Sequence, residues 1–438
     1  MLIRLAFHGL LAGLFSLALI AQTPNEPPSH NADRELAKLL AEKRYLEMGA
    51  ALERVRTHQT RDYGFYAGVL ANRQNRLHES LRRLEPLFGK PATLLTPEQR
   101  RVGLRTMADN YFKLFRYGDA AGAYTRLLEE LAATASEPER NEVRGSLRLA
   151  ELLRKAAAQT LHMESAFIVP TQRNAVGLIE APVEIGGRME RWALDTGANI
   201  STLTRSRATR LGLALSSGTA PVAGLGGRRV QCHVAIIPEL RIGRAEFHHV
   251  ATLVIEDQDF YIPEVKFQME ALLGYPVLAA LGQISFYADG HFGANPGPGS
   301  IDAQGAPLLL EELTPLVAAG TSKGPRLFTF DTGAANTFLT APYWREHSAE
   351  FAGLEVGKLE IGGSGGTQTI PSYTAAHVTL VFGRTPISID DVPVLTAPRH
   401  AGQEPFYGNI GQDAMSKLRN FTLDFRVMRL SVDSSGQR

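Results

Sequence analysis

The tetrapeptide Asp-Thr-Gly-Ala occurs twice in this chain, at residues 195–198 and again at residues 331–334. Each copy follows an apolar run, Trp-Ala-Leu at 192–194 and Leu-Phe-Thr-Phe at 327–330. A single Asp-Thr-Gly is typical of a turn at a strand end, because aspartate caps the turn and glycine adopts backbone angles that other residues avoid. Two copies in matching surroundings indicate two carboxylates brought face to face.

The duplication extends beyond the tetrapeptides. A glycine-rich segment at 224–227 returns at 362–366, and Leu-Leu-Gly at 272–274 returns as Asn-Ile-Gly at 409–411. The interval between the two copies is nearly the same for these segments as for the two aspartates. Because the order and the spacing are both kept, the sequence predicts two homologous lobes.

This ordered set resembles the aspartic proteases of the retropepsin and pepsin group, and the resemblance covers about the last 270 residues. It implies that each lobe supplies one catalytic aspartate, Asp195 and Asp331, at a shared interface. Retropepsins do this as homodimers with two glycine-rich flaps, and pepsins as one chain with one dominant flap that bears a tyrosine. This chain resembles a hybrid, with fused lobes and two glycine-rich segments. It departs from the pattern at Asn409, where an apolar residue is expected, and in the lack of a tyrosine in the first flap.

The resemblance also implies roles for the residues around the aspartates. Thr196 and Thr332 would hydrogen-bond across the lobe interface and fix its geometry. Gly197 and Gly333 would let the backbone approach the carboxylates closely. The flap and substrate-binding residues would be Gly224, Leu225, Gly226, Gly227, Gly363, Ser364, Gly365 and Gly366.

Paired carboxylates suit acid–base chemistry without a metal or a cofactor, and we expect neither. Two carboxylates about 3 Å apart cannot both ionise, so the pair holds one proton and titrates as a unit. One member activates a water while the other protonates the scissile carbonyl. Alanine follows each glycine, where pepsin-like enzymes often carry a hydroxyl that donates to the dyad. Without that donor one influence that lowers a carboxylate pKa is missing, and we expect a weakly acidic or neutral optimum.

Two other motifs have weaker support. Residues 362–366 also match the Gly-x-Ser-x-Gly pattern of serine hydrolases, but that elbow must open a helix, and the residues that follow are β-prone and include Pro371. His248 and His249 are adjacent, yet no cysteine or carboxylate stands at a recognisable ligand spacing around them. A flap and a solvated strand end are the favoured interpretations.

Residues 33–163 have helical periodicity and almost no strand signal. Small residues and aromatics recur with the same internal spacing over 108–124 and 68–84, and a weaker unit lies over 39–48. These segments resemble tetratricopeptide repeats, although their offset exceeds the usual period of about 34 residues. An ordinary amphipathic helical bundle is the alternative. Either arrangement is a stacked helical array with a groove or flank suited to protein contacts.

The first 21 residues are typical of an export signal, since Arg4 precedes an apolar run that ends at Ala21. An uncleaved membrane anchor is the alternative, because the run from Leu5 to Ala21 lies at the short limit of a membrane span. Cys232 is the only cysteine, so no intrachain disulfide can form. We therefore expect a periplasmic or secreted protein that meets a membrane only if the signal is uncleaved.

The charge of the chain is nearly balanced overall but uneven along its length. A formal net charge of +1 gives no signal for nucleic-acid binding. Residues 30–163 carry 23 Lys and Arg against 17 Asp and Glu, whereas residues 164–438 carry 22 against 27. The two parts therefore have opposite net charges and could attract one another.

Together these features predict a multi-domain α+β protein, in which an N-terminal α-helical repeat domain precedes two homologous all-β acid-protease lobes. We expect an exported aspartic endopeptidase that acts on proteins or peptides as a monomeric catalytic unit, with helical repeats that dock a substrate or partner or regulate access. A non-catalytic peptide-binding adaptor is the alternative. The expected segments are an export signal (1–21), a tether (22–32), the helical domain (33–163), the first lobe (165–290), a Gly/Pro-rich linker (291–305) and the second lobe (306–438).

Overall fold

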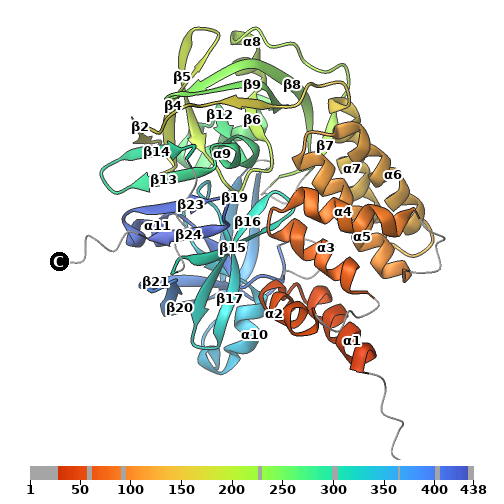
Figure 1. Ribbon diagram of the computed structural model, residues 1–438. Helices are drawn as coiled ribbons and strands as arrows, with labels where there is room; N and C mark the ends of the chain where they lie inside the picture. Colours follow the sequence, from red (N-terminus) through yellow and green to blue (C-terminus); the bar gives the residue numbers. More distant parts are fainter. Residues whose placement is uncertain are drawn as a thin grey trace, which may run out of the picture.

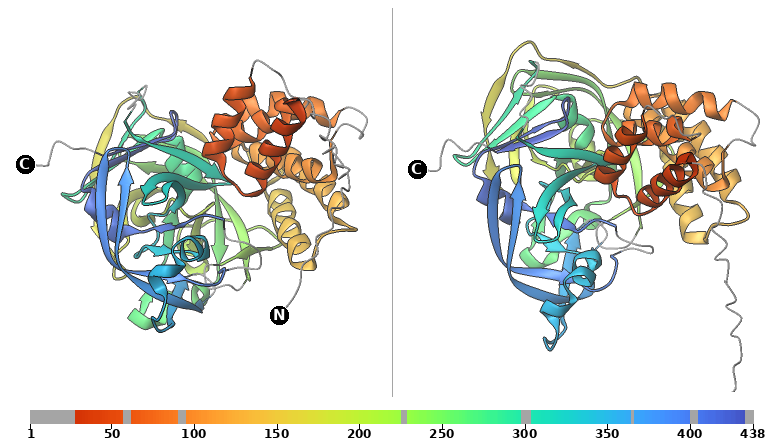
Figure 2. Two further views of the ribbon diagram at one scale, coloured as in Figure 1. Left: turned by 90° about the horizontal axis from the view of Figure 1, so that it is seen from below. Right: turned by 60° about the horizontal axis from the view of Figure 1, so that its bottom comes forward.

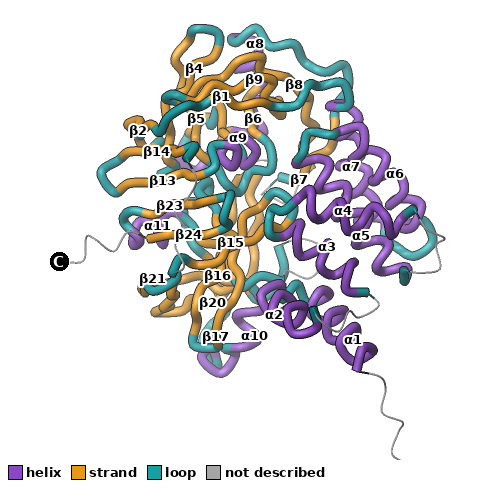
Figure 3. The backbone as a smooth tube through the Cα atoms, in the orientation of Figure 1, coloured by secondary structure: helices purple, strands orange, loops and turns teal. Residues whose placement is uncertain are grey.

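The structure is a computed structural model that describes residues 28–56, 62–89, 95–224, 229–297, 304–363, 366–399 and 405–432. The expected export signal and the first part of the expected tether, 22–27, lie outside these ranges. Helices gather on one side of the molecule and strands on the other (Figures 1 and 3). The described residues therefore agree with the α+β class.

The N-terminal part is built from helices, drawn red to light orange in Figure 1. Threonine and serine begin two of them, because the hydroxyls of Thr96 and Ser136 accept the otherwise unpaired amides of Gln99 and Glu139. None of the described helices is long and apolar enough to cross a membrane. The helices are α1 (Pro28–Ala41), α2 (Tyr45–Val55), α3 (Tyr63–Arg73), α4 (Leu77–Phe88), α5 (Pro97–Lys113), α6 (Tyr117–Leu131) and α7 (Glu137–Leu153).

Three pairs of these helices are joined by the same tight turn. Lys43, Asn75 and Phe115 each have a positive φ, of 52°, 58° and 58°. In each turn the amide of the next residue bonds the carbonyl five positions back, at 2.8 Å, which satisfies a carbonyl that the helix end leaves free. These turns set the α1–α2, α3–α4 and α5–α6 pairs in equivalent register. Membership of the tetratricopeptide family stays a prediction.

The first lobe is a sheet in the order β1-β9-β6-β12-β5-β4-β8-β7, with β3 paired to β4. The two strands before Asp195 form a hairpin, and Gly186 and Gly187 form its turn with positive φ. The elements are β1 (Thr160–His162), β3 (Gln172–Arg173), β4 (Ile179–Ile185), β5 (Arg188–Leu194), β6 (Ser201–Thr204), α8 (Arg205–Arg210), β7 (Ala220–Ala223), β8 (Arg229–Ile242), β9 (Ala245–Ile255), η2 (Asp257–Phe260), β10 (Tyr261–Ile262), η3 (Pro263–Val265), β11 (Phe267–Gln268), β12 (Ala271–Leu273) and α9 (Tyr275–Ala280).

The second lobe repeats the central arrangement, because β22 lies parallel to β17 and antiparallel to β18 as β12 lies parallel to β5 and antiparallel to β6. Its strands continue the order β19-β20-β21-β18-β22-β17-β16-β15. The elements are β15 (Ala306–Glu311), β16 (Thr314–Thr321), β17 (Gly324–Phe330), β18 (Phe338–Leu339), α10 (Ala341–Glu346), η4 (Ser348–Phe351), β19 (Gly357–Gly363), β20 (Gly366–Phe382), β21 (Thr385–Leu395), β22 (Gly408–Ile410) and α11 (Gln412–Leu418).

A shared sheet joins the two lobes. Strand β13 of the first lobe pairs antiparallel with β23 of the second, from Gln283 opposite Asp424 to Phe286 opposite Phe421. Phe286 and Phe421 stack with ring centroids 5.0 Å apart, so side chains from both lobes meet across this junction. The ribbon views show the strands of the two lobes together, with the N-terminal helices to one side of them (Figures 1 and 2). The strands that complete it are β2 (Phe167–Pro170), β13 (Gln283–Tyr287), β14 (His291–Asn295), β23 (Phe421–Asp424) and β24 (Arg429–Val432).

Three expected boundaries differ from the structure. Helix α1 begins at Pro28, inside the expected tether, because that segment continues into the first buried helical face. The expected helical domain runs to 163, but its last strand, β1, pairs with β9 of the first lobe. The expected linker begins at 291, where β14 instead pairs with β13 and β2. Strand β1 carries a weak sequence signal because it is short and its partner β9 is distant in the chain.

Candidate active site

Each Asp-Thr-Gly loop follows a buried strand that ends beside a partner strand from later in the same lobe. Strand β5 ends at Leu194, and the Asp195 amide bonds the Leu273 carbonyl of β12 at 3.0 Å. In the second lobe β17 ends at Phe330, and the Asp331 amide bonds the Ile410 carbonyl at 3.1 Å. The apolar-apolar-Gly segments therefore hold the two aspartate loops from behind.

The two loops meet through reciprocal hydrogen bonds between threonines. The Thr196 hydroxyl donates to the Phe330 carbonyl at 2.8 Å and accepts the Thr332 amide at 3.1 Å. The Thr332 hydroxyl donates to the Leu194 carbonyl at 2.7 Å and accepts the Thr196 amide at 3.0 Å. Both threonines have no exposed surface. Each hydroxyl therefore satisfies two buried backbone groups of the opposite lobe.

The glycines place each loop against the opposite carboxyl group. A Cβ added at Gly197 would lie 2.5 Å from Cγ of Asp331, and one added at Gly333 would lie 2.3 Å from Cγ of Asp195. Neither gap accommodates a methyl group, so both positions require glycine. The structure thus brings together the six residues expected at the dyad: Asp195, Thr196, Gly197, Asp331, Thr332 and Gly333.

The surroundings favour protonation of the carboxyl pair. Burial and the charge of Asp331 raise the pKa of Asp195 well above its ordinary value. Burial also raises the pKa of Asp331, although the Gly333 amide and the charge of Arg399 oppose this rise. Since the two groups are coupled, the pair titrates as a unit and retains a proton at higher pH than an isolated aspartate.

Backbone amides orient the two carboxyl groups. Oδ1 of Asp195 accepts the amides of Gly197 and Ala198, both at 2.9 Å, and Oδ1 of Asp331 accepts the amide of Gly333 at 2.8 Å. The Asp-Thr-Gly turn therefore fixes one oxygen of each carboxyl group. The alanines supply no hydroxyl.

The expected flap residues are only partly described. Gly224 is buried directly after β7, and Gly366 begins β20, where it pairs with Gly363 across the β19–β20 hairpin. Leu225, Gly226, Gly227, Ser364 and Gly365 lie outside the described residues. Both glycine-rich segments thus connect antiparallel strands, β7–β8 and β19–β20. Because a strand follows the second segment, a serine-hydrolase elbow does not fit.

Two residues near the dyad carry no recognisable motif. Asn409 departs from the expected apolar pattern, and Thr329 on the neighbouring strand hydrogen-bonds its side chain. Gln412, buried at the start of α11, donates from Nε2 to the Thr332 carbonyl at 2.8 Å. Asn409 stands out in the sequence as an exception to the repeat, whereas Gln412 becomes visible only when β22 and α11 are placed.

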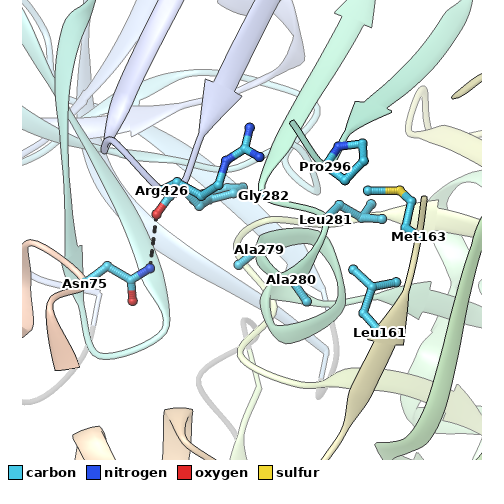
Figure 4. A pocket seen from close by; sticks show the side chains of 10 residues that line it. Asn75, Leu161, Met163, Ala279, Ala280, Leu281, Gly282, Pro296 and Arg426 are labelled. Carbon is cyan, nitrogen blue, oxygen red and sulfur yellow. Dashed lines mark hydrogen bonds between the residues drawn. The ribbon is translucent and has the colours of Figure 1, made fainter. Parts of the chain in front are cut away.

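Two other features lie away from the dyad, a cluster of polar side chains on the first lobe and a cleft beside the helical part. Within the described residues, Glu239, Glu246 and His248 form a cluster with metal-ligand geometry, but the Arg241 guanidinium already contacts both carboxylates at 2.8 and 3.0 Å. A cleft of about 380 Å³ lies where the helical part meets both lobes, and neither aspartate lines it (Figure 4). Neither place belongs to the dyad.

Comparison with known families and structures bears on the protease part of the chain. Residues 181–277 match the family model described as aspartyl protease. This match supports an aspartic protease fold and a protease hydrolase. It covers the first Asp-Thr-Gly, the first glycine-rich segment and Leu-Leu-Gly. A comparison with curated proteins gave no match.

Two solved structures are among those to which the chain is similar. One is a retropepsin-like aspartic protease from Rickettsia conorii, with 19% identity over 32% of this chain and 95% of that chain and a TM-score of 0.22. The other is Basic 7S globulin from soybean, with 12% identity over 63% of this chain and 96% of that chain and a TM-score of 0.39.

We expect Gly333→Ala to abolish dyad geometry, because its Cβ would overlap the Asp195 carboxyl group. Overpacking of this kind costs about 1–3 kcal/mol. The unfolding midpoint in denaturant measures that loss. The matched control is Gly122→Ala on α6, where a Cβ meets nothing within 4 Å, and the substitution should be neutral or stabilising by up to about 1 kcal/mol. Equal midpoints for the two variants would contradict this account.

We expect Thr196→Val to destabilise the lobe interface by about 2–4 kcal/mol, since the Phe330 carbonyl and the Thr332 amide would both lose a buried partner. Thr196→Ser keeps the hydroxyl and should cost only about 1 kcal/mol, for the lost methyl group. Urea unfolding of the two variants measures the difference. If serine is no better than valine, the hydroxyl is not what joins the loops.

Proposed function

We propose that this protein is an exported aspartic endopeptidase whose catalytic dyad is Asp195 and Asp331. The observation that carries the proposal is the reciprocal bonding of Thr196 and Thr332, which sets each aspartate against the opposite loop's glycine. The aspartyl protease match over residues 181–277 supports the same chemistry. A binding module has no evident need for two carboxyl groups that each pack against the glycine of the opposite loop.

In the proposed reaction the pair holds one proton when substrate binds. The ionised carboxylate removes a proton from a water molecule as the water oxygen attacks the scissile carbonyl carbon, and the protonated carboxyl donates its proton to the carbonyl oxygen. In the collapse of the resulting tetrahedral diol, the carboxyl that took the water proton passes it to the amide nitrogen. The other carboxylate removes a proton from a diol hydroxyl as the C–N bond breaks, so the pair again holds one proton. The amides that bond Oδ1 of each aspartate fix the orientation of the carboxyl group.

The hairpins β7–β8 and β19–β20 are the proposed contacts for an extended peptide. Both carry a glycine-rich segment between antiparallel strands. Backbone groups of an extended peptide can bond such segments as an added strand does, so affinity would come from the main chain and specificity from side-chain pockets. Export rests on the apolar leader, and docking or regulation by the helical domain rests on its stacked helix pairs.

The second candidate function is a peptide-binding adaptor with an inactive protease-like fold. The helical part favours it, because helical arrays commonly offer protein-binding surfaces. The presence of both aspartates in a hydrogen-bonded setting favours catalysis instead. The two functions differ in whether the carboxyl groups are needed for peptide-bond cleavage.

We expect Asp195→Asn and Asp331→Asn each to reduce kcat/KM for a cleaved peptide by at least about a hundredfold, because each removes half of the acid–base pair. The measurement is cleavage of a peptide library followed by mass spectrometry. A carboxyl whose pKa is raised on folding destabilises the protein progressively as pH rises from its unfolded-state pKa, about 4 for aspartate, through its folded-state pKa. At pH 7 both variants should therefore unfold no more easily than wild type. Persistent cleavage in both would end the dyad assignment.

The raised pKa values predict where the pH–rate profile lies. The active pair holds one proton, so activity falls on the alkaline side as that proton leaves and on the acid side as a second binds. Because burial raises the pKa of both groups, the alkaline limb, where the pair loses its shared proton, should lie above the ordinary aspartate value of about 4. We expect kcat/KM to peak at weakly acidic or neutral pH, and a peak near pH 2–3 would contradict this.

A further inference from the structure

The turn between β15 and β16 of the second lobe enters the helical domain. Oε1 of Glu311 lies 2.7 Å from Nζ of Lys43, and Oε2 accepts the Tyr45 hydroxyl at 2.6 Å. Nε of Arg73 lies 3.3 Å from Oε2. Two hydrogen-bond donors, Lys43 and Tyr45, and the Arg73 guanidinium, which forms an ion pair, thus converge on one carboxylate. We call Lys43, Tyr45 and Arg73 the basic pocket.

The basic pocket is largely shielded from water. The side chains of Arg73 and Glu311 are 7% and 20% exposed. Burial alone would raise the pKa of Glu311, but the charges of Arg73 and Lys43 lower that pKa to about 2. Glu311 is therefore ionised when it occupies the pocket. Removing one member of such a pair leaves the other charge buried without its partner, which is strongly destabilising.

The neighbouring residue of the turn makes a longer and more exposed contact with the helical domain. Glu312 has a positive φ of 53°, and its carboxylate lies 3.6 Å from Nη1 of Arg105 on α5. Arg105 also donates to Glu142 on α7 at 2.6 Å. The turn that carries Glu311 and Glu312 therefore contacts α2, α3 and α5 directly. It is linked to α7 through the side chain of Arg105.

The other side of this turn contacts the first aspartate loop. The Thr314 hydroxyl donates to Oδ1 of Asn199 at 3.3 Å, and Asn199 directly follows the Asp-Thr-Gly-Ala of the first lobe. Leu313, which lies between Glu312 and Thr314 in the turn, is 7% exposed. The turn therefore lies between the basic pocket and the loop that carries Asp195.

The helical domain also contacts the first lobe. Nε of Arg148 on α7 donates to the Thr219 carbonyl at 3.2 Å, and Nη1 of Arg229 on β8 donates to the Asn141 carbonyl at 3.1 Å. At the lobe junction Nδ2 of Asn75 donates to the Phe425 carbonyl at 3.2 Å, at the edge of the cleft in Figure 4. The helical domain thus contacts the first lobe and the junction between the lobes, in addition to the β15–β16 turn of the second lobe.

We propose that the helical domain is an intramolecular brace for the dyad, and that Glu311 is the positioning residue through which it acts. This rests on the proposed peptidase function. The basic pocket fixes the Glu311–Glu312 turn, and the turn supports the Asp195 loop through Thr314 and Asn199. Since the chain's own glutamate fills the pocket, a substrate or partner would bind there only by displacing it, and the displacing group would have to be acidic.

The decisive test compares Glu311→Gln with wild type in the full chain, by amide hydrogen exchange and by peptide kinetics. The variant keeps the side-chain shape and removes the charge. We expect exchange in residues 195–199 to rise about tenfold, as local opening becomes easier. We expect kcat to fall while KM stays within about twofold, because the effect is on the dyad and not on peptide affinity.

Matched variants keep the test interpretable. Lys43→Met removes the partly exposed member of the pair and should show the same pattern if Glu311→Gln does not fold. Thr314→Val should lower kcat, and Thr314→Ser should restore it, because serine keeps the hydroxyl. The control is Glu346→Gln, which removes an ion pair with Arg326 in the same lobe and should leave exchange at 195–199 unchanged.

The outcomes separate the brace from the peptidase proposal. Unchanged exchange at 195–199 in Glu311→Gln and Lys43→Met, with faster exchange in the 309–314 turn, would overturn the brace, because the turn would then loosen without reaching the dyad loop. The exchange measurement needs no turnover. If wild type cleaves no peptide while exchange still rises in the variants, the peptidase function fails and the brace stands.

Discussion

The structure depends on one pair of reciprocal hydrogen bonds, in which Thr196 and Thr332 each satisfy two buried backbone groups of the opposite lobe. These bonds hold together two loops whose partly buried carboxyl groups would repel each other if both were ionised. The penalty for leaving such backbone groups unpaired resists separation of the lobes. Glycine on each side then lets the opposite carboxyl approach within a distance that any side chain would block.

The rest of the fold supports this contact from two directions. The shared sheet joins the lobes through β13 and β23, and β12 and β22 bond the amides of the two aspartates. On the other side the helical domain binds the β15–β16 turn with buried charges and reaches both lobes. The opposite net charges of the two parts therefore have a local counterpart, in the contacts of Lys43, Arg73 and Arg105 with Glu311 and Glu312.

The lobes repeat the same arrangement without being identical. Two amides bond Oδ1 of Asp195, whereas one bonds Oδ1 of Asp331. Asn409 replaces an apolar residue and finds a partner in Thr329. The β15–β16 turn of the second lobe is bound by the helical domain, whereas in the corresponding β3–β4 turn of the first lobe an added Cβ at Gly177 would meet no atom within 4 Å. These differences place Asp195 and Asp331 in unequal surroundings.

The α+β class and the meeting of the two Asp-Thr-Gly loops could be predicted from the sequence, because an apolar strand followed by Asp-Thr-Gly is a local signal that occurs twice. The pairing of β1 with β9, the contact of Gln412 with Thr332 and the occupant of the basic pocket emerge only from the folded chain. Each of these joins residues far apart in the sequence. Glu311 lies in the second lobe and Arg73 in the third helix, and no local pattern shows that two charges so distant will be buried together.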